Sequence, residues 1–294
     1  GGGHAGAEAA LAAARMHVKT LLITARIDAI ARMPCNPSVG GLAKSHLVYE
    51  LDALGGEMGR NADETALQAK ILNRSRGPAV WATRCQCAKQ DYTARMQSVV
   101  LNQINLSVLE DSVISILRQN ERVSGVVTEL NGPINATSVV LTSGTSLRGR
   151  IWIGQECVES GGDHRPAINK LSNSLEALGF ELIRLKTGTP PRLKASSCDF
   201  NKCTSQDGEN PRPLFHVEHD DVMDDDDARV PRGTKLPELP CWMTHTTELT
   251  HEIIRNNLQS SPLYGGQITG TGVRYCPSIE DKIVRFKSAS QHHV

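Results

Sequence analysis

The chain opens with Gly1-Gly2-Gly3-His4-Ala5-Gly6, the stretch that decides its fold. Gly1, Gly3 and Gly6 satisfy the pattern G-x-G-x-x-G, and the alanine-rich residues 7–16 that follow favour a helix. Residues 19–24 have the apolar pattern of a short buried strand. Turn, helix and strand in this order form a dinucleotide-binding unit, because glycines let the backbone approach a pyrophosphate and the helix start supplies N–H groups. The stretch therefore predicts a dinucleotide site, with a simple tight turn as the alternative.

One part of the usual dinucleotide pattern is missing. The acidic residue that binds the ribose is expected at the end of the second strand, where this chain has Thr24, with Asp28 four residues further on. We therefore expect ribose recognition to be atypical or to come from elsewhere. Because no strand and no initiator methionine precede the glycine turn, we also expect a fragment cut at its N-terminus.

Composition excludes several classes of protein. With 294 residues, 39% of them hydrophobic and 22% charged, the chain has a globular composition, not a disordered or collagen-like one. The 32 basic and 32 acidic residues leave no overall field for nucleic acid, so such binding requires local basic patches. No apolar run approaches the roughly 18 residues of a membrane span. The 8 irregularly spaced cysteines are typical of reduced intracellular thiols.

The rest of the chain alternates helical and strand-like segments. Helices are expected over residues 42–54, 92–101 and 171–178, the last ending at Gly179. Strands over residues 113–117, 123–130 and 138–141 predict an antiparallel meander. Residues 141–145 have the pattern of a strand-to-loop exit on the dinucleotide side. Residues 196–240 are polar and rich in Pro and Asp, which predicts a long loop.

Two cysteines have a chemical context. Cys35 lies between prolines, ahead of Gly40-Gly41 and a helix, and Cys276 follows Arg274 and precedes Pro277. Proline favours the first helical position, which would put Cys276 at an N-cap, where a thiolate is stabilised. Context alone leaves buried structural thiols as the alternative.

Seven blocks in order relate the chain to a known family. They are GGGHAGAEAALAAAR, CNPSVGGLAKSHL, DALGGEMG, ILNRSRGPAV, RLKTGTPPR, PCWMTHTTELTHEIIRNNL and SPLYGGQITGTGVRYCPSIEDKIVRF. Together they closely resemble the flavoprotein subunit of the tRNA wobble-uridine modification enzyme, the MnmG or GidA family. The resemblance covers nearly the whole chain, and RYCPSIEDK is the most specific part.

The resemblance implies an α/β fold. An FAD-binding Rossmann-like domain of the glutathione-reductase type, discontinuous and without its first strand, would cover residues 1–195. An inserted second dinucleotide-binding domain for the nicotinamide cofactor, incomplete here, would cover residues 196–294 and include the polar acidic loop at 196–240. Because the family's C-terminal helical region is absent, we expect this chain alone to be inactive. Relatives form homodimers and work in the bacterial cytoplasm or, for mitochondrial counterparts, the matrix.

The resemblance also implies an activity. Family members carry FAD and work with a GTPase partner (MnmE). The pair adds an aminomethyl or carboxymethylaminomethyl group to carbon 5 of the wobble uridine of tRNA. Methylenetetrahydrofolate donates the one-carbon unit, and NADH reduces the flavin. Two alternatives stay open: a folate-dependent tRNA uridine methyltransferase flavoprotein, and a non-catalytic remnant with a binding role.

Individual positions take roles from the matching motifs. Cys35 and Cys276 match the family's two functionally important cysteines, and the N-cap argument favours Cys276 as the nucleophile. The FAD phosphate loop matches Gly1, Gly2, Gly3, His4, Ala5 and Gly6, and further FAD contacts fall at Val113 and Ser172. The nicotinamide segment matches Gly272, Arg274, Tyr275, Pro277, Ser278, Glu280, Asp281 and Lys282.

Basic residues beside the TGTPP loop give the best local patch for tRNA phosphates, with ordinary surface charge as the alternative. These are Arg184, Lys186, Arg192 and Lys194. Cys198, Cys203, His216 and His219 fit no common zinc spacing, so we expect no metal site. The chain departs from the family at residues 163–166, where Asp-His-Arg-Pro replaces a loop that contains glycine and arginine.

Overall fold

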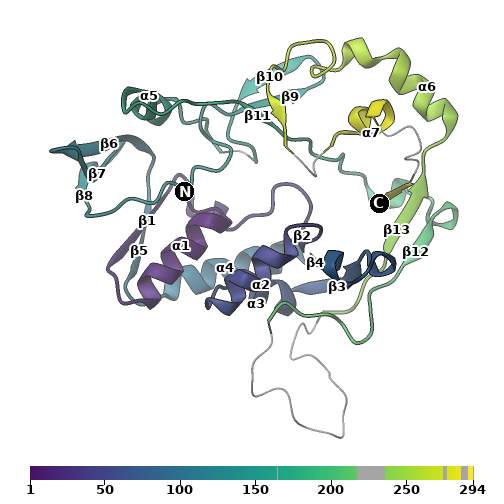
Figure 1. Cartoon of the computed structure of the whole chain (residues 1–294), viewed down its shortest axis with the longest axis horizontal. Coiled ribbons are helices and arrows are strands. Elements are labelled where there is room, and N and C mark those ends of the chain that lie inside the picture. Colours follow the sequence, from purple (N-terminus) through teal and green to yellow (C-terminus); the bar gives the residue numbers. More distant parts are fainter. Residues whose placement is uncertain (164, 217–235, 274–276, 286–290, 294) are drawn as a thin grey trace, which may run out of the picture. The chain divides into compact units, whose positions relative to one another are not determined.

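The computed structural model describes residues 1–163, 165–216, 236–273, 277–285 and 291–293 (Figure 1). The chain is a mixed α/β protein that divides into two compact units, each built from separate segments. Unit 1 comprises Gly1–Pro34, Val48–Asn61 and Ala88–Leu182, and unit 2 comprises Cys35–Leu47, Ala62–Cys87 and Ile183–Val294. The expected domain boundary at residue 195 stays a prediction.

Unit 1 begins with the predicted turn, helix and strand. Helix α1 (His4–Arg15) leads into strand β1 (Thr20–Thr24), and helix α4 (Lys89–Asn102) leads into strand β5 (Leu106–Glu110). The two strands are parallel, with Leu22 opposite Val108. Apolar side chains of both helices and of β1 form one buried cluster, which holds these elements together: Ala7, Ala10, Leu11, Leu22, Met96 and Val100. The sequence pattern of residues 7–24 thus predicted the helix and the strand.

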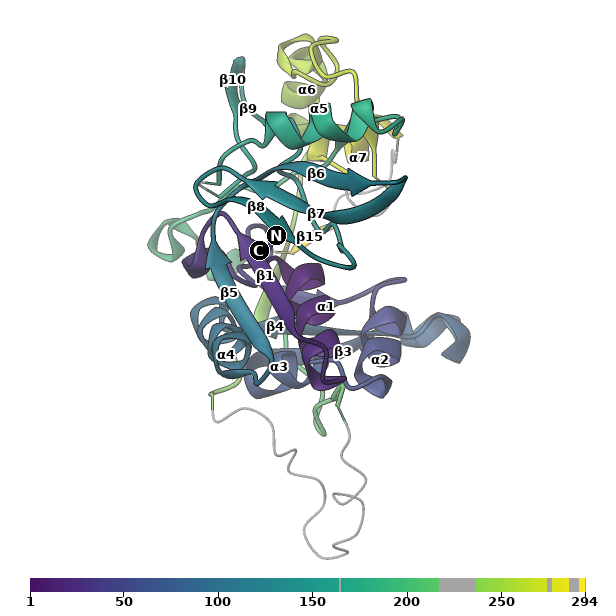
Figure 2. The same cartoon turned by 90° about the vertical axis from the view of Figure 1, so that its left-hand side faces the viewer.

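A meander follows in unit 1. Strands β6 (Val113–Gln119), β7 (Arg122–Thr128) and β8 (Gly132–Asn135) pair antiparallel in sequence order. Helix α5 (Asn169–Ala177) lies along β6 (Figure 2), and the Ile116 backbone N–H donates to the Ser174 hydroxyl at 3.1 Å. Strands β9 (Arg150–Ile153) and β10 (Glu156–Glu159) form a separate hairpin.

The prediction of a strand over residues 138–141 is wrong. Within the described residues this segment joins no strand ladder, and Val140 and Leu141 are exposed. The third strand of the meander is instead β8, which starts directly after the Asn131-Gly132 turn. A β-branched, apolar segment becomes a strand only where a neighbouring backbone pairs with it.

Helices α2 (Ser45–Ala53) and α3 (Met58–Glu64) run across the division between the units. The expected helix at 42–54 starts three residues late because Gly41 and Ala43 have φ of 91° and 60°, which a right-handed helix does not accommodate. None of the helices in the described part of the chain is both long and apolar enough to cross a lipid bilayer.

The described residues of unit 2 form three small sheets. Strands β2 (Ser38–Gly40), β4 (Ala82–Cys87) and β3 (Ala66–Leu72) form one sheet with β4 in the centre. β11 (Leu185–Lys186) pairs parallel with β14 (Thr271–Gly272). The third sheet has the order β12 (Thr204–Gln206), β13 (Cys241–His245) and β15 (Gln291–His293). Helices α6 (Glu248–Asn256) and α7 (Ile279–Arg285) complete the unit, with short 3-10 turns between the elements.

The polar segment 196–240 is not simply a loop. It supplies strand β12, and Phe215 is buried against Gly40. The buried Asp63 carboxylate accepts the Phe215 N–H at 2.9 Å and the His216 N–H at 2.7 Å. Residues 217–235, with the aspartate run, lie outside the described residues. A buried carboxylate and one aromatic side chain therefore order a stretch that its composition describes as a loop.

A carboxylate cluster fixes α1 within unit 1. Glu57 accepts from Arg15 at 2.6 Å and from Arg95 at 2.8 Å. Glu8, on α1, accepts the N–H groups of Glu57 at 3.0 Å and Met58 at 2.6 Å and so caps the start of α3. Burial tends to raise the pKa of Glu57, but the hydrogen bonds and charges of the two arginines outweigh it and lower the pKa below its ordinary value.

We therefore expect Glu57→Gln to lower the free energy of unfolding at pH 7 by about 2 kcal/mol, since it leaves two partly exposed guanidinium groups without their anion. Because the folded-state pKa is lowered, the stabilisation is complete above the unfolded pKa of about 4.3 and is lost as the pH falls further. Urea unfolding at pH 7 and pH 3 measures both. The control is Glu50→Gln, because Glu50 is an exposed residue of α2. This substitution should change the free energy of unfolding little at either pH. Equal losses for both variants would contradict the role of the cluster.

Candidate functional site

The glycine turn at the start of α1 contains two kinds of glycine. A Cβ on Gly1 would lie 2.4 Å from the Thr142 carbonyl oxygen, and a Cβ on Gly2 would lie 2.9 Å from Thr24 Oγ1. On Gly6 it would lie 1.8 Å from the Gly1 oxygen. These three glycines are required by close packing. A Cβ on Gly3 would meet nothing within 4 Å, and its φ of −65° suits any residue, so neither packing nor conformation requires glycine there.

Thr142 completes the turn. Its hydroxyl donates to the Gly1 carbonyl oxygen at 3.0 Å, while the Gly1 amino group donates to the Ile23 carbonyl oxygen of β1 at 2.8 Å. Thr142 therefore lies at the glycine turn, but residues 138–141 before it form no strand within the described ranges, so the expected strand-to-loop exit at 141–145 is wrong. Parts of the chain far apart in sequence thus meet at the turn.

The start of α1 has the properties of an anion-binding site. The helix is 12 residues long, Gly3 is its N-cap, and no side chain caps it. The backbone N–H groups of its first turn and the positive end of the helix dipole therefore face the open space beside Gly3. Burial lowers the pKa of His4, whose ring lies 5.6 Å from that of Tyr92, so the imidazole is neutral. The positive potential comes from the backbone.

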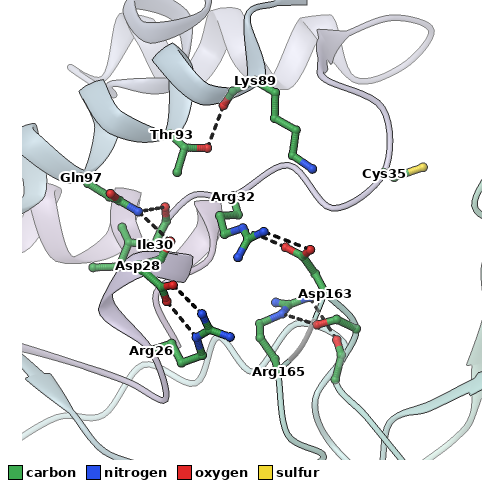
Figure 3. Close-up of polar contacts among 12 residues, drawn as sticks. Arg26, Asp28, Ile30, Arg32, Cys35, Lys89, Thr93, Gln97, Asp163 and Arg165 are labelled. Atoms are coloured by element: carbon green, nitrogen blue, oxygen red, sulfur yellow. Dashed lines mark hydrogen bonds and ion pairs between the residues drawn. The ribbon is translucent and has the colours of Figure 1, made fainter. Parts of the chain in front are cut away.

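No carboxylate stands at the end of β1, as expected. Thr24 is buried there, and Asp28 lies beyond it in a pair with Arg26, whose Nε is 2.8 Å from Asp28 Oδ1 (Figure 3). The hydrogen bond from Arg26 lowers the pKa of Asp28. Glu110, at the end of β5, accepts the Ile27 N–H at 2.7 Å. Asp28 is therefore ionised, and its carboxylate is already paired with Arg26.

Residues 161–165 carry an ion pair that the sequence did not indicate. Arg32 Nε lies 3.0 Å from Asp163 Oδ2, and Arg165 donates to the carbonyl oxygens of Gly162 at 2.9 Å and Gly161 at 3.0 Å (Figure 3). Asp163 has a φ of 52°, a left-handed conformation that Asp tolerates better than most residues. Arg32 and Asp163 are 131 residues apart, so no local pattern could have predicted the pair.

Cys35 and Arg192, predicted for different roles, lie together in unit 2. The Arg192 guanidinium donates to the Cys35 carbonyl oxygen. The Cys35 thiol is partly buried. Its segment is anchored to β4, since the Cys87 N–H donates to the Pro37 oxygen at 2.7 Å. The structure thus joins the backbone of one predicted catalytic residue to one predicted tRNA contact.

The predicted N-cap position of Cys276 is wrong. Helix α7 begins at Ile279, and the hydroxyl of Ser278 accepts the Asp281 N–H at 3.3 Å while Asp281 accepts the Ser278 N–H at 3.3 Å. This reciprocal pair is a capping box, in which Ser278 is the N-cap residue. The helix therefore starts after Ser278 and not at Pro277. Cys276 itself lies outside the described residues, as do Arg274 and Tyr275. The reason to prefer Cys276 over Cys35 as nucleophile is therefore removed.

Asp281 anchors the nicotinamide-type segment internally. It accepts from Tyr264 Oη at 3.0 Å and lies 3.4 Å from Lys186 Nζ. Burial raises its pKa, but Tyr264, Ser278 and Lys186 together lower it more. Glu280 accepts from the Ser261 hydroxyl at 3.0 Å. The acidic side chains of this segment therefore already have protein partners.

The other predicted residues are placed as follows. Lys186 lies opposite Gly272 in the β11–β14 pair, so the TGTPP and nicotinamide-type segments adjoin in unit 2. Arg184, Arg192 and Lys194 are exposed, Pro277 is exposed, and Lys282 is partly buried. Val113 starts β6, and Ser172 is fully buried with its hydroxyl donating to the Ile168 oxygen at 3.1 Å. Their cofactor and tRNA roles stay predictions.

The remaining cysteines form no metal cluster in the part of the chain that the structure describes. Cys85 and Cys87 are both buried on β4, with their sulfur atoms 3.8 Å apart. The hydrogen bond with Cys87 and then burial raise the pKa of Cys85, so the Cys85 thiol stays protonated.

Comparison with known proteins identifies relatives over the whole chain. The family described as "Glucose inhibited division protein A" matches residues 1–294. The chain is 46% identical over 294 residues to the Bacillus subtilis tRNA uridine 5-carboxymethylaminomethyl modification enzyme MnmG. It is 47% identical to the MnmG of Geobacillus thermodenitrificans. All of the chain is covered, but only 45% of each relative, so it spans about half their length.

Solved structures agree with the sequence comparison. GidA of Aquifex aeolicus matches all of the chain with a TM-score of 0.87 and 44% identity, over 48% of its own length. A second crystal form of GidA matches with a TM-score of 0.85 and 41% identity. The predicted α/β, Rossmann-like fold class is thereby confirmed. From its glycine turn to its last strand, the chain belongs to the glucose inhibited division protein A (GidA) family.

Proposed function

We propose that the chain is part of an FAD-dependent enzyme that adds an aminomethyl or carboxymethylaminomethyl group to carbon 5 of the wobble uridine in tRNA. Two relatives are named for tRNA uridine 5-carboxymethylaminomethyl modification. The observation that carries the proposal here is the open space beside Gly3 at an uncapped helix start. It is a cradle that a side chain at residue 3 would fill.

The residues of this turn fit the diphosphate of FAD. The backbone of Gly3, His4 and Ala5 would hold its oxygens, and the absence of a Cβ at residue 3 lets them come close. The neutral His4 adds no charge, so affinity depends on backbone N–H groups and the helix dipole. When bound, FAD supplies two-electron redox chemistry. NADH, as its reductant, is assigned to the segment from Gly272 to Lys282.

Carbon 5 of uracil is a weak nucleophile, so the reaction needs a protein nucleophile that adds to the ring and activates carbon 5. A thiolate from Cys35 or Cys276 would form a bond to carbon 6, and the electrons of the 5,6 double bond would move to the carbon-4 oxygen as an enolate. Carbon 5 would then attack the methylene carbon of an iminium, in which ammonia or glycine has replaced tetrahydrofolate as the partner of the one-carbon unit, so that the new carbon–carbon bond leaves the amine attached and tetrahydrofolate is released. Loss of the carbon-5 proton to a base and departure of the thiolate would restore the double bond. Arg192, at the Cys35 backbone, would hold this segment in place.

The partners follow from the same assignment. The family resemblance supports a GTPase partner and a homodimer of the whole protein. The relatives named above are bacterial, which supports a bacterial cytoplasmic location, with the mitochondrial matrix as the alternative.

Gly3→Ala should weaken FAD binding about tenfold or more while the fold is retained, because the new Cβ meets no protein atom but occupies the space of the diphosphate. Flavin absorbance of the purified whole protein, and titration of stripped protein with FAD, measure this. Gly188→Ala is the control, since its Cβ meets only Ser278 at 3.8 Å. Full flavin content in Gly3→Ala would contradict the proposed cradle.

Cys35→Ser in the whole protein should reduce wobble-uridine modification at least about a hundredfold while FAD content and bleaching of the flavin by NADH are unchanged. Nucleoside analysis of tRNA after reaction with the GTPase partner, NADH and methylenetetrahydrofolate gives the readout. Cys157→Ser, an exposed thiol in the β9–β10 hairpin, is the control. A bare methyl group on the T-loop uridine would instead identify the folate-dependent methyltransferase. A colourless protein that takes up no FAD would leave only a binding role.

A further inference from the structure

The central sheet of unit 2 places two cations directly opposite one another. In the β3–β4 ladder Lys70 is the register partner of Arg84. Partners across an antiparallel ladder lie on the same face with Cβ atoms about 5 Å apart, and like charges in such positions are destabilising. Both side chains are partly buried, which removes some of the water that would otherwise screen them.

Other groups of the protein offset the repulsion between Lys70 and Arg84 only in part. Lys70 Nζ donates to a neutral amide oxygen, Gln206 Oε1, at 3.3 Å. The Arg84 guanidinium makes no hydrogen bond or ion pair with any residue of the described ranges. Arginine carries N–H donors in a planar fork, and leaving them partly buried without an acceptor is costly.

Glu209, the carboxylate that interacts electrostatically with Lys70, already forms an ion pair with another residue. Glu209 forms a bidentate ion pair with Arg74, in which Arg74 Nε lies 2.9 Å from Glu209 Oε1. The Glu209 carboxylate also accepts the Ile71 N–H at 3.0 Å. Arg74 also lies over the Trp81 ring, 5.2 Å from its centroid. Arg74 therefore takes both oxygens of Glu209, and neither Lys70 nor Arg84 forms an ion pair with a carboxylate in the described ranges.

We propose that Lys70 and Arg84 form a phosphate-binding subsite. The Arg84 fork matches two phosphoryl oxygens, and the Lys70 ammonium contributes a point charge beside it. The phosphate is either a phosphodiester of bound tRNA or the diphosphate of a dinucleotide. The identity of the tRNA ligand rests on the proposed function, but phosphate binding itself does not.

The position of the subsite favours tRNA as the source. Gly40 of β2 is the register partner of Arg84 on its other side, and Gly40 lies five positions after Cys35 in the chain. Five residues span at most about 18 Å, so a tRNA with its uridine at Cys35 has neighbouring nucleotides within reach of Arg84. Basic residues that contact the backbone position the strand without reading its sequence.

The test uses the whole protein with Arg84→Gln and Lys70→Gln. We expect each variant to weaken tRNA binding about tenfold near 0.1 M salt, and to reduce the slope of log affinity against log salt by roughly 0.7 to 0.9, because one phosphate contact is lost. Fluorescence anisotropy between about 50 and 200 mM salt measures both. Lys202→Gln is the control of equal charge change, since Lys202 is 83% exposed and, among the described residues, pairs only with Asp199. It should leave the slope unchanged.

A second arm titrates the same variants with NADH and FAD. Unchanged tRNA binding with about tenfold weaker dinucleotide binding would assign the subsite to a diphosphate. No loss in either arm relative to Lys202→Gln overturns the proposal. Arg84→Lys keeps the positive charge but loses the planar pair of guanidinium N–H donors. If this variant is folded and binds tRNA with an affinity between those of the wild type and Arg84→Gln, the loss in Arg84→Gln reflects phosphate binding and not a folding defect. Because every readout is binding, a failure of uridine modification leaves this result interpretable.

Discussion

The close approach of backbone to backbone at the first turn of α1 is the constraint on which the candidate cofactor site depends. Gly1, Gly2 and Gly6 pack so tightly against Thr142, Thr24 and one another that no side chain fits. This packing brings the start of α1 to the end of β1 and to the segment after the meander. Gly3 is the exception, since the protein leaves the space beside it empty.

The other end of the same unit fixes α1 by charge instead of by packing. Glu57 joins Arg15 of α1 to Arg95 of α4, and Glu8 caps α3. The apolar cluster around Leu11, Leu22 and Met96 lies among these contacts. A helix held along its length in this way keeps its first turn, and hence its N–H groups, in a defined position.

Unit 2 shows how residues of different predicted roles share one scaffold. Cys35 and Arg192 meet at a backbone carbonyl group, and Lys186 lies opposite Gly272 while its ammonium group pairs with the buried Asp281. In the RYCPSIEDK stretch, the described residues Ser278 and Asp281 have a structural role. Ser278 and Asp281 start α7, which moves the helix start away from Cys276.

Local sequence was sufficient for features that depend on neighbours along the chain. The G-x-G-x-x-G turn, helix α1, strand β1, the first two strands of the meander and α5 follow from periodicity and turn residues, and the motif blocks identified the family. Only the tertiary structure decided the Arg32–Asp163 pair, the burial of Phe215, the start of α7, the unpaired segment 138–141 and the opposition of Lys70 and Arg84. The physical reason is that strand pairing, ion pairs and burial are made between residues distant in sequence, so no local pattern records which partner each one meets.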